Sequence, residues 1–174
     1  MPPEVSAAVL LLVDPSDPGL PLLFIRRSRR VRTHRGQIAF PGGAIDPEDA
    51  GVVEAALREG HEELGIPPDL VEPLGLLTTV WTRGSERSLC PVVGLQRAEV
   101  SPVADGSEVD TWFRIPLAEL LEAPLTSRHI PGMPATAVVH FIEAHGQVIW
   151  GATAAVLLDL LQRLRIAMGA LPQR

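Results

Sequence analysis

The stretch of residues 55–65, AALREGHEELG, places three glutamates within five positions of a segment with helical periodicity. At about 100° per residue, Glu63 lies about 40° and Glu62 about 60° from Glu59, on opposite sides of it, so the three carboxylates share one helix face. Carboxylates at this spacing can bind a hard divalent cation such as Mg²⁺, and a bound cation can activate water for attack on a phosphate. The alternative is a solvated acidic face, because each like-charge pair costs only roughly 0.2–0.5 kcal/mol.

The same segment carries a glycine and an arginine that would position these carboxylates. Gly60 falls in the middle of the apolar stripe of the expected helix, which consists of Val53, Ala56, Leu57 and Leu64. Glycine costs roughly 1 kcal/mol against alanine inside a helix, which indicates close approach of the helix backbone to a sheet. Arg58 lies four residues after Glu54 and four before Glu62, so it can pair with either carboxylate.

Turn residues on both sides set the expected bounds of this helix. The sequence GQIAFPGG predicts a short strand that ends in a turn at Gly42 and Gly43. The acids of DPED at residues 46–49 favour a helix start, because negative charge is stabilised at the positive end of the helix dipole. Gly65, followed by two prolines, predicts the end of the helix.

Apolar runs predict the sheet that carries the helix. Residues 6–13 and 21–26 are separated by DPSDPG, which is typical of two strands joined by a turn. Further strands are expected near residues 74–81, 88–96, 110–115 and 137–143, and a second long helix from Trp150. Strands outnumber the long helices, so we expect a mixed sheet packed between helices.

The composition is that of a folded protein and argues against several classes of function. The chain has 174 residues, 46% hydrophobic and 21% charged, so we expect one domain spanning residues 1–174. The net charge of −6 disfavours binding to nucleic acid or to an anionic membrane. No run approaches ~20 consecutive apolar residues, and residues 7–13 lack a basic leader, so a cytoplasmic location is expected. Cys90 is the only cysteine and can form no intramolecular disulfide.

The helix motif resembles the Nudix box, whose pattern is G-x5-E-x7-R-E-U-x-E-E-x-G-U, with U a bulky aliphatic residue. Seven positions match it: Gly43, Arg58, Glu59, Glu62, Glu63, Gly65 and Ile66. The loop between Gly43 and Arg58 has fourteen residues where the pattern has thirteen. The first glutamate of the pattern therefore falls on Asp49 or Ala50, and no role is assigned to Asp49. Gly60 replaces the aliphatic residue, which agrees with close packing of the helix.

Residues 26–43, RRSRRVRTHRGQIAFPGG, resemble the additional signature of the coenzyme A pyrophosphatase branch of this family, L-L-T-x-R-S-x3-R-x3-G-x-V-x-F-P-G-G. The matching residues are Arg27, Ser28, Arg32, Gly36, Phe40, Pro41, Gly42 and Gly43, with Ile38 in place of valine. Phe24 and Ile25 depart from the start of the signature. PVVG at 91–94 and WGATA at 150–154 also look like this branch, so the resemblance covers most of the chain. It implies the α/β fold of a Nudix-type α/β/α sandwich with a mixed β-sheet.

The resemblance also implies an activity, hydrolysis of the diphosphate bond of coenzyme A or acyl-coenzyme A to 3′,5′-ADP and (acyl-)4′-phosphopantetheine, with Mg²⁺ or Mn²⁺ as cofactor. Glu59 and Glu63 are the first expected metal ligands, and Glu62 is a third ligand or the general base. Glu62, Glu63 and Arg58 form the expected catalytic group, with Arg58 holding a carboxylate in place. Glu108, in ADGSEVD, is another candidate base or a solvated loop acid.

Arginine side chains are the groups of this chain that are expected to bind the phosphates of the substrate. All fifteen basic residues are arginine, and six of them fall between residues 26 and 35. The other nine arginines, against twenty-one acidic residues, leave the rest of the chain at −12. Guanidinium groups bind phosphate oxygens in pairs and keep their charge, which suits a substrate with a diphosphate and a separate 3′-phosphate. The residues expected to bind substrate are Arg27, Arg32, Arg35, Gly42, Gly43 and Arg83, while Arg26, Arg29 and Arg30 are expected to be solvated.

Two other functions stay open at this point. One is another Nudix activity, on ADP-ribose or a dinucleotide. The other is a nucleotide-binding regulator without catalysis, which the complete R-E-x-x-E-E motif argues against. The expected partner is a small-molecule substrate, with no nucleic acid and no membrane, and the sequence predicts no particular oligomeric state.

Overall fold

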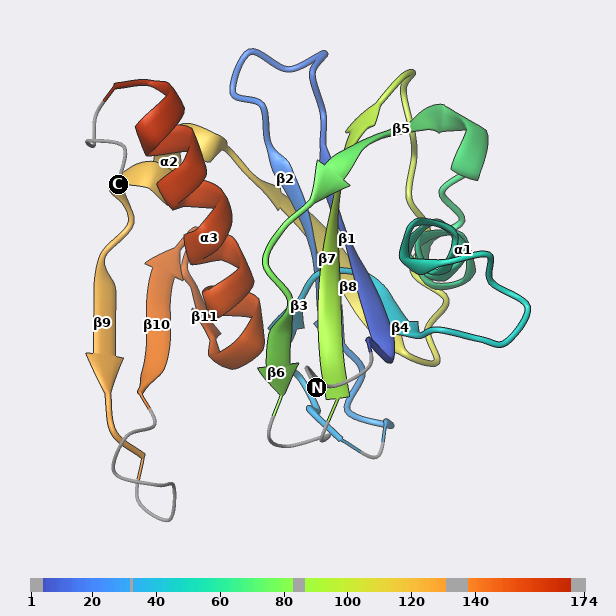
Figure 1. Cartoon of the computed structure of the whole chain (residues 1–174), viewed down its shortest axis with the longest axis horizontal. Helices are drawn as coiled ribbons and strands as arrows, with labels where there is room; N and C mark the ends of the chain where they lie inside the picture. Colours follow the sequence, from blue (N-terminus) through green and yellow to red (C-terminus); the bar gives the residue numbers. More distant parts are fainter. Residues whose placement is uncertain (1–4, 32, 83–86, 131–137, 170–174) are drawn as a thin grey trace.

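The computed structural model describes residues 5–31, 33–82, 87–130 and 138–169 of the chain. Its centre is an eight-stranded sheet (Figure 1). The strands of this main sheet are β1 (Ala7–Val13), β2 (Leu22–Arg27), β3 (Ile38–Ala39), β4 (Gly42–Ala44), β5 (Val71–Leu76), β6 (Val80–Thr82), β7 (Arg87–Gln96) and β8 (Val109–Ile115). A second, three-stranded sheet consists of β9 (Leu125–Arg128), β10 (Val139–Ala144) and β11 (Gln147–Trp150). The helices are α1 (Val52–Leu64), α2 (Leu117–Glu122), α3 (Gly151–Ala167) and the short 3₁₀ helix η1 (Pro68–Leu70).

The main sheet is mixed and is organised around β1. This strand pairs in parallel with β7 along its whole length, and all seven of its residues are buried, as expected for a strand covered on both faces. On its other edge β1 pairs antiparallel with β2 at Val13 and with β4 at residues 7–9. Because β4 replaces β2 as the neighbour of β1, the end of β2 diverges from β1 and leaves the short glycine-containing strand between them.

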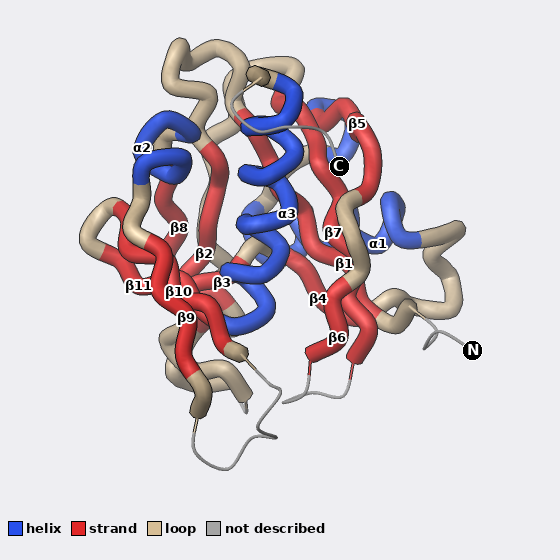
Figure 2. The backbone as a smooth tube through the Cα atoms, turned by 60° about the vertical axis from the view of Figure 1, so that its left-hand side comes forward, coloured by secondary structure: helices blue, strands red, loops and turns tan. Residues whose placement is uncertain are grey.

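Helices cover both faces of the main sheet. Helix α1 lies on one face, and α3 lies on the other, between the main sheet and the three-stranded sheet (Figures 1 and 2). Alternate residues of β1 enter two separate apolar cores, because successive side chains of a strand point to opposite faces. Leu11 belongs to the core with Leu157 of α3, whereas Leu10 belongs to the core with Ala56 of α1.

The structure confirms most of the expected elements and corrects their bounds. The strand pair at residues 6–13 and 21–26 is confirmed, as are both long helices. The expected helix start at residues 46–49 is wrong, because α1 begins at Val52 and the acids lie in the loop before it. The strand expected at residues 74–81 is divided into β5 and β6. Helix α2 and strands β9 and β11 were not predicted from the sequence, because they are too short to show a clear period.

Gly60 lies on the buried face of α1, directly over β1. A Cβ atom at this position would lie 3.1 Å from Cδ2 of Leu10, which is tighter than most contacts of real Cβ atoms. The missing side chain therefore allows the helix backbone to approach the sheet. The close packing that the sequence predicts at Gly60 is confirmed.

Replacing Gly60 by leucine should lower the free energy of unfolding by about 1–3 kcal/mol, because the new side chain must push α1 away from Leu10. Gly60→Ala is the matched control. Its single methyl group adds a tight contact but gains about 1 kcal/mol of helix propensity, so the two effects should nearly cancel. Urea denaturation followed by circular dichroism measures both variants, and unchanged stability of Gly60→Leu would contradict the tight packing.

Candidate active site

The turn between β3 and β4 points a backbone amide at the end of α1. Gly42 has a φ of 150°, and a Cβ there would collide with the backbone of Ala8 and Val9 in β1, so the position requires glycine. The Gly42 N–H donates a 3.0 Å hydrogen bond to Oε2 of Glu63. The Glu63 side chain is only 4% exposed. The sequence thus buries one of the three clustered carboxylates against a main-chain donor.

The next residue of β4 makes room for a second carboxylate. A Cβ at Gly43 would overlap the carboxylate of Glu59, so glycine is needed here for space. Glu59 is mostly buried, whereas Glu62 on the next turn is 56% exposed. Consecutive glycines of one short strand therefore lie against Glu63 and Glu59, while Glu62 faces solvent.

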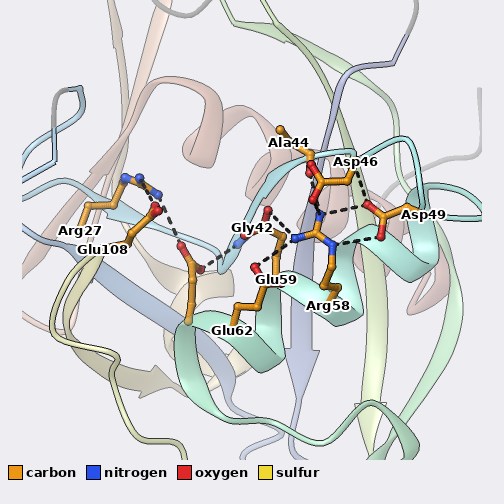
Figure 3. A network of polar contacts seen from close by, with 10 residues as sticks. Arg27, Gly42, Ala44, Asp46, Asp49, Arg58, Glu59, Glu62 and Glu108 are labelled. Carbon is orange, nitrogen blue, oxygen red and sulfur yellow. Dashed lines mark hydrogen bonds and ion pairs between the residues drawn. The ribbon is translucent and has the colours of Figure 1, made fainter.

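Arg58 is surrounded by acceptors from three parts of the chain (Figure 3). Its Nε and Nη2 donate to both oxygens of Asp49 at 3.0 Å, and Nη2 also donates to the carbonyl of Ala44 at 2.9 Å. Its Nη1 donates to Glu59 at 3.2 Å and to Glu62 at 3.1 Å. Arg58 thus ties the loop before α1 to two of the clustered carboxylates.

Asp49 has the structural role that its position in the sequence left open. Its side chain is 4% exposed and accepts the N–H of Asp46 as well as the paired donors of Arg58. The Arg58 guanidinium, aided by this N–H, holds the pKa of Asp49 below its usual value. Asp49 therefore remains charged and fixes the guanidinium. The possible pair between Arg58 and Glu54 does not form, because Glu54 accepts the N–H of Ala50 instead.

A second arginine reaches the carboxylates from the main sheet. Nη1 of Arg27, near the end of β2, lies 3.6 Å from Oε1 of Glu63, and Nη2 lies 3.3 Å from Oε2 of Glu108. In Figure 3, Arg27 and Glu108 lie together on the opposite side of Gly42 from Arg58. The structure therefore brings Glu108 to the site, which the sequence left undecided.

The two buried glutamates of the site, Glu59 and Glu63, are hard to ionise in the absence of a cation. Burial raises the pKa of Glu63 to about 8, although the Gly42 N–H and Arg27 oppose this shift and Glu59 and Glu108 reinforce it. Burial also raises the pKa of Glu59, against the opposing effect of Arg58. Bringing a positive charge to these groups would therefore stabilise the ionised site.

The donor set fits a divalent cation. Among the described residues, Oε1 of Glu63 is the buried side-chain oxygen or nitrogen that lacks a hydrogen-bond partner. A buried acceptor with a free lone pair is suited to a hard cation, which takes oxygen ligands. Within the described ranges, however, the carboxylates are not already gathered as a group of three or more that could hold a metal ion. A cation bound by these carboxylates would therefore have to draw them together.

The other arginines predicted to bind substrate are in different situations. Arg35 is exposed and donates from Nε to the carbonyl of Val31 at 2.8 Å. Arg32 and Arg83 lie outside the described residues. The prediction that Arg26 is solvated is wrong, because it is half-buried and donates to Gln147 of β11 at 2.5 Å.

The turn that holds Glu108 was not predicted from the sequence. Asp105 accepts the N–H groups of Ser107, Glu108 and Val109, which forms a compact turn before β8. The sequence DGS within ADGSEVD is a signal for such a turn, because aspartate bonds to the backbone that follows it.

Two cavities of about 570 and 520 Å³ lie elsewhere, beside α2 and beside the β1–β2 turn. Neither is lined by the residues around Glu63.

Comparison with known proteins decides the family. The model of the NUDIX domain matches residues 2–136 of the chain. The chain belongs to the Nudix family. A protein of Photorhabdus laumondii named as an uncharacterized Nudix hydrolase, NudL, is 37% identical over 163 residues, which are 92% of this chain and 85% of the relative. A NudL of Yersinia enterocolitica is 38% identical over 148 residues, with 83% of this chain and 74% of the relative covered.

Solved structures show that the fold is the Nudix α/β/α sandwich. RenU, a Nudix hydrolase of M. smegmatis, has a TM-score of 0.60 at 19% identity and covers 98% of this chain and 89% of its own. The Ap4A hydrolase of C. elegans has a TM-score of 0.55 at 19% identity, with coverages of 64% and 80%. The Nudix domain of Shewanella oneidensis NrtR, solved with ADP ribose, has a TM-score of 0.52 at 21% identity, with coverages of 71% and 80%.

Membership of the family makes the chain a Nudix hydrolase, a pyrophosphohydrolase that acts on a nucleoside diphosphate-linked substrate. Nudix hydrolases generally use divalent ions such as Mg²⁺ or Mn²⁺. None of the helices in the described part of the chain is long and apolar enough to cross a membrane.

The raised pKa of Glu63 predicts how the stability of the metal-free enzyme depends on pH. The folded protein keeps a proton on Glu63 up to about pH 8, whereas the unfolded chain releases it near the ordinary pKa of 4.5. Stability should therefore fall as pH rises between these values, with a slope of at most about 1.4 kcal/mol per pH unit from this proton. Glu63→Gln should flatten the slope, and Glu62→Gln is the matched exposed control. Urea denaturation at pH 5–8 tests this, and equal slopes in the wild type and Glu63→Gln would contradict it.

Proposed function

We propose that this enzyme hydrolyses the diphosphate bond of coenzyme A or acyl-coenzyme A, releasing 3′,5′-ADP and (acyl-)4′-phosphopantetheine. The observation that carries the proposal is the 3.6 Å approach of Nη1 of Arg27 to Oε1 of Glu63. Arg27 matches the signature of the coenzyme A branch, and Glu63 matches the Nudix box. A phosphate-binding cation of the branch signature thus lies next to the carboxylates that we assign to the metal.

In this proposal the carboxylates of α1 form the metal site. Glu59 and Glu63 hold the cation, and Glu62 is the third oxygen ligand or the general base. When bound, Mg²⁺ or Mn²⁺ offsets the charge of the diphosphate and lowers the pKa of the attacking water. Arg58 fixes the carboxylates of Glu59 and Glu62 through one nitrogen, Nη1. The exposed carboxylates of Glu62 and Glu108 are the groups that we assign to accept the proton of the water.

The arginines supply recognition of the phosphates. Arg27 is positioned for the diphosphate, because its guanidinium already lies beside the carboxylates of the metal site. We assign Arg32, Arg35 and Arg83 to the substrate as well, with the 3′-phosphate as the anion that distinguishes coenzyme A from simpler diphosphates. We also assign Gly42 and Gly43 to the substrate side of the site, where Gly42 donates its N–H to Glu63 and the missing side chain of Gly43 leaves room for Glu59.

The metal-ligand assignment predicts a loss of turnover without a loss of fold. Glu59→Gln and Glu63→Gln each keep the shape of the side chain and remove its charge. Each should lower kcat by at least about 100-fold, as expected for groups that act in the transition state. Glu54→Gln, on the exposed side of the same helix, is the matched control and should keep normal turnover. Near-normal kcat in both site variants, with folding verified by circular dichroism, would reject the assignment.

The substrate assignment is tested with a panel of compounds. The enzyme is incubated with Mg²⁺ or Mn²⁺ and coenzyme A, dephospho-coenzyme A, ADP-ribose or a diadenosine polyphosphate, and the products are identified by mass. We expect coenzyme A to react fastest, giving 3′,5′-ADP and 4′-phosphopantetheine, because the 3′-phosphate adds charge-assisted hydrogen bonds worth about 1.5–3 kcal/mol each.

Two results of this panel would overturn the proposal. Faster release of AMP from ADP-ribose would indicate the related Nudix activity. No cleavage of any compound with metal present would indicate a nucleotide-binding regulator.

A further inference from the structure

Arg27 lies beside Glu63, one of the carboxylates that the proposed function assigns to the metal. Its Nη1 lies 3.6 Å from Oε1 of Glu63, the buried oxygen without a hydrogen-bond partner among the described residues. This distance allows charge attraction but exceeds that of a hydrogen bond. The contact is therefore a charge attraction that is complete once Glu63 is ionised, and it leaves the lone pairs of Oε1 unsatisfied.

The backbone on both sides of Arg27 is fixed, so only the side chain can move. Its N–H donates to the carbonyl of Gln37 at 2.9 Å, and its carbonyl accepts the N–H of Gly36 at 3.0 Å. The pairing of β2 with β8 shifts register between Arg26 and Arg27, and such a bulge changes the direction of the side chain that follows. The strand thus presents one guanidinium, on a flexible stem, to the site.

Arg27 also has a second anionic partner, away from α1. Its Nη2 donates to Oε2 of Glu108, which is 59% exposed. The backbone of Glu108 is held by the Ser28 N–H, at 2.7 Å, and by the turn at Asp105. The guanidinium therefore lies between a buried carboxylate that belongs to the metal helix and an exposed one that a substrate anion can approach.

A divalent cation on Oε1 of Glu63 would compete with Arg27, because this is the oxygen that the Arg27 guanidinium faces. The guanidinium and the cation would be like charges on one carboxylate, and their repulsion is strong where water is excluded. The described carboxylates are also not yet gathered into a cluster that could hold a metal. The charge that stabilises the metal-free site is therefore the charge that a metal must displace.

We infer that Arg27 is an exchangeable cation: it is paired with Glu63 in the metal-free enzyme and moves to the phosphates of the substrate when a divalent ion takes Glu63. The inference rests on the proposed function in one respect, the assignment of Glu63 as a metal ligand. Its consequence is positive coupling between metal and phosphate. Bound phosphate would draw Arg27 away from Glu63, where it opposes the cation, and a bound cation would release Arg27 from Glu63 for the phosphate. By linkage, each ligand raises the affinity for the other by the same factor.

The test measures Mn²⁺ binding from the electron paramagnetic resonance signal of free Mn²⁺, with and without imidodiphosphate. This diphosphate analogue has no P–O–P bond that the enzyme could hydrolyse. Arg27→Gln should bind Mn²⁺ alone at least about fivefold more tightly than the wild type, because the opposing charge is gone. The same variant should lose most of the gain in affinity that imidodiphosphate gives the wild type. Arg27→Met, which keeps the apolar stem, should behave like Arg27→Gln.

Arg29→Gln is the matched control, since it removes an exposed arginine of the same segment. It should retain the wild-type affinity and coupling, and chelation of Mn²⁺ by imidodiphosphate in solution is common to all variants. Arg27→Lys keeps a charge at the site and should restore weak binding of Mn²⁺ alone. The inference would be overturned if Arg27→Gln and Arg27→Met bound Mn²⁺ no more tightly than Arg29→Gln. It would also be overturned if these two variants kept the full coupling between Mn²⁺ and imidodiphosphate.

None of these titrations measures turnover, so the inference and the proposed function fail separately. A different preferred substrate in the compound panel would leave the affinities for Mn²⁺ unchanged. Glu63→Gln that binds Mn²⁺ as tightly as the wild type would instead reject Glu63 as a ligand, and the exchange of Arg27 with it. Normal hydrolysis of coenzyme A by the wild type, with no effect of Arg27→Gln on Mn²⁺ binding, would reject the exchange alone.

Discussion

Burial of the Glu63 carboxylate is the constraint on which the geometry of the site depends. A buried charge is costly unless neighbouring groups compensate for it, and Glu63 receives only one N–H bond and one distant guanidinium. Each of these needs a particular backbone. The N–H bond requires a residue without a side chain at Gly42, and the burial requires α1 to lie close to β1, which Gly60 allows. The charge of the Glu63 carboxylate is thus incompletely compensated, which favours the binding of a cation.

The two arginines around the carboxylates differ in how firmly they are held. Arg58 donates to acceptors on Asp49, Ala44, Glu59 and Glu62 at 2.9–3.2 Å, so moving it would break several good hydrogen bonds together. The hydrogen bonds to Asp49, followed by the charge of Glu59, raise the pKa of Arg58 above its usual value. Arg27, in contrast, has its two carboxylate contacts at 3.3 and 3.6 Å. The same residue type therefore serves as a fixed support on one side and as a movable charge on the other.

The sequence predicted those features that depend on local pattern or on a motif. The helix period placed Gly60 against the core, and the apolar runs gave β1 and β2, because both signals lie in neighbouring residues. Partners far apart in the chain were not predictable in this way. The contacts of Arg27 with Glu108 and of Arg26 with Gln147 join residues 81 and 121 positions apart. They depend on the pairing of β2 with β8 and on the placement of the second sheet, which no local pattern specifies.

The loop before α1 shows how a departure from the family pattern is accommodated. Compared with the Nudix box, this loop has one additional residue, and an aspartate stands where counting forward from Gly43 gives glutamate. Asp49 meets Arg58 with both oxygens at 3.0 Å, and its turn is closed by the N–H of Asp46 at 2.8 Å. In this chain Asp49 therefore fixes the orientation of Arg58 on which its contacts with Glu59 and Glu62 depend.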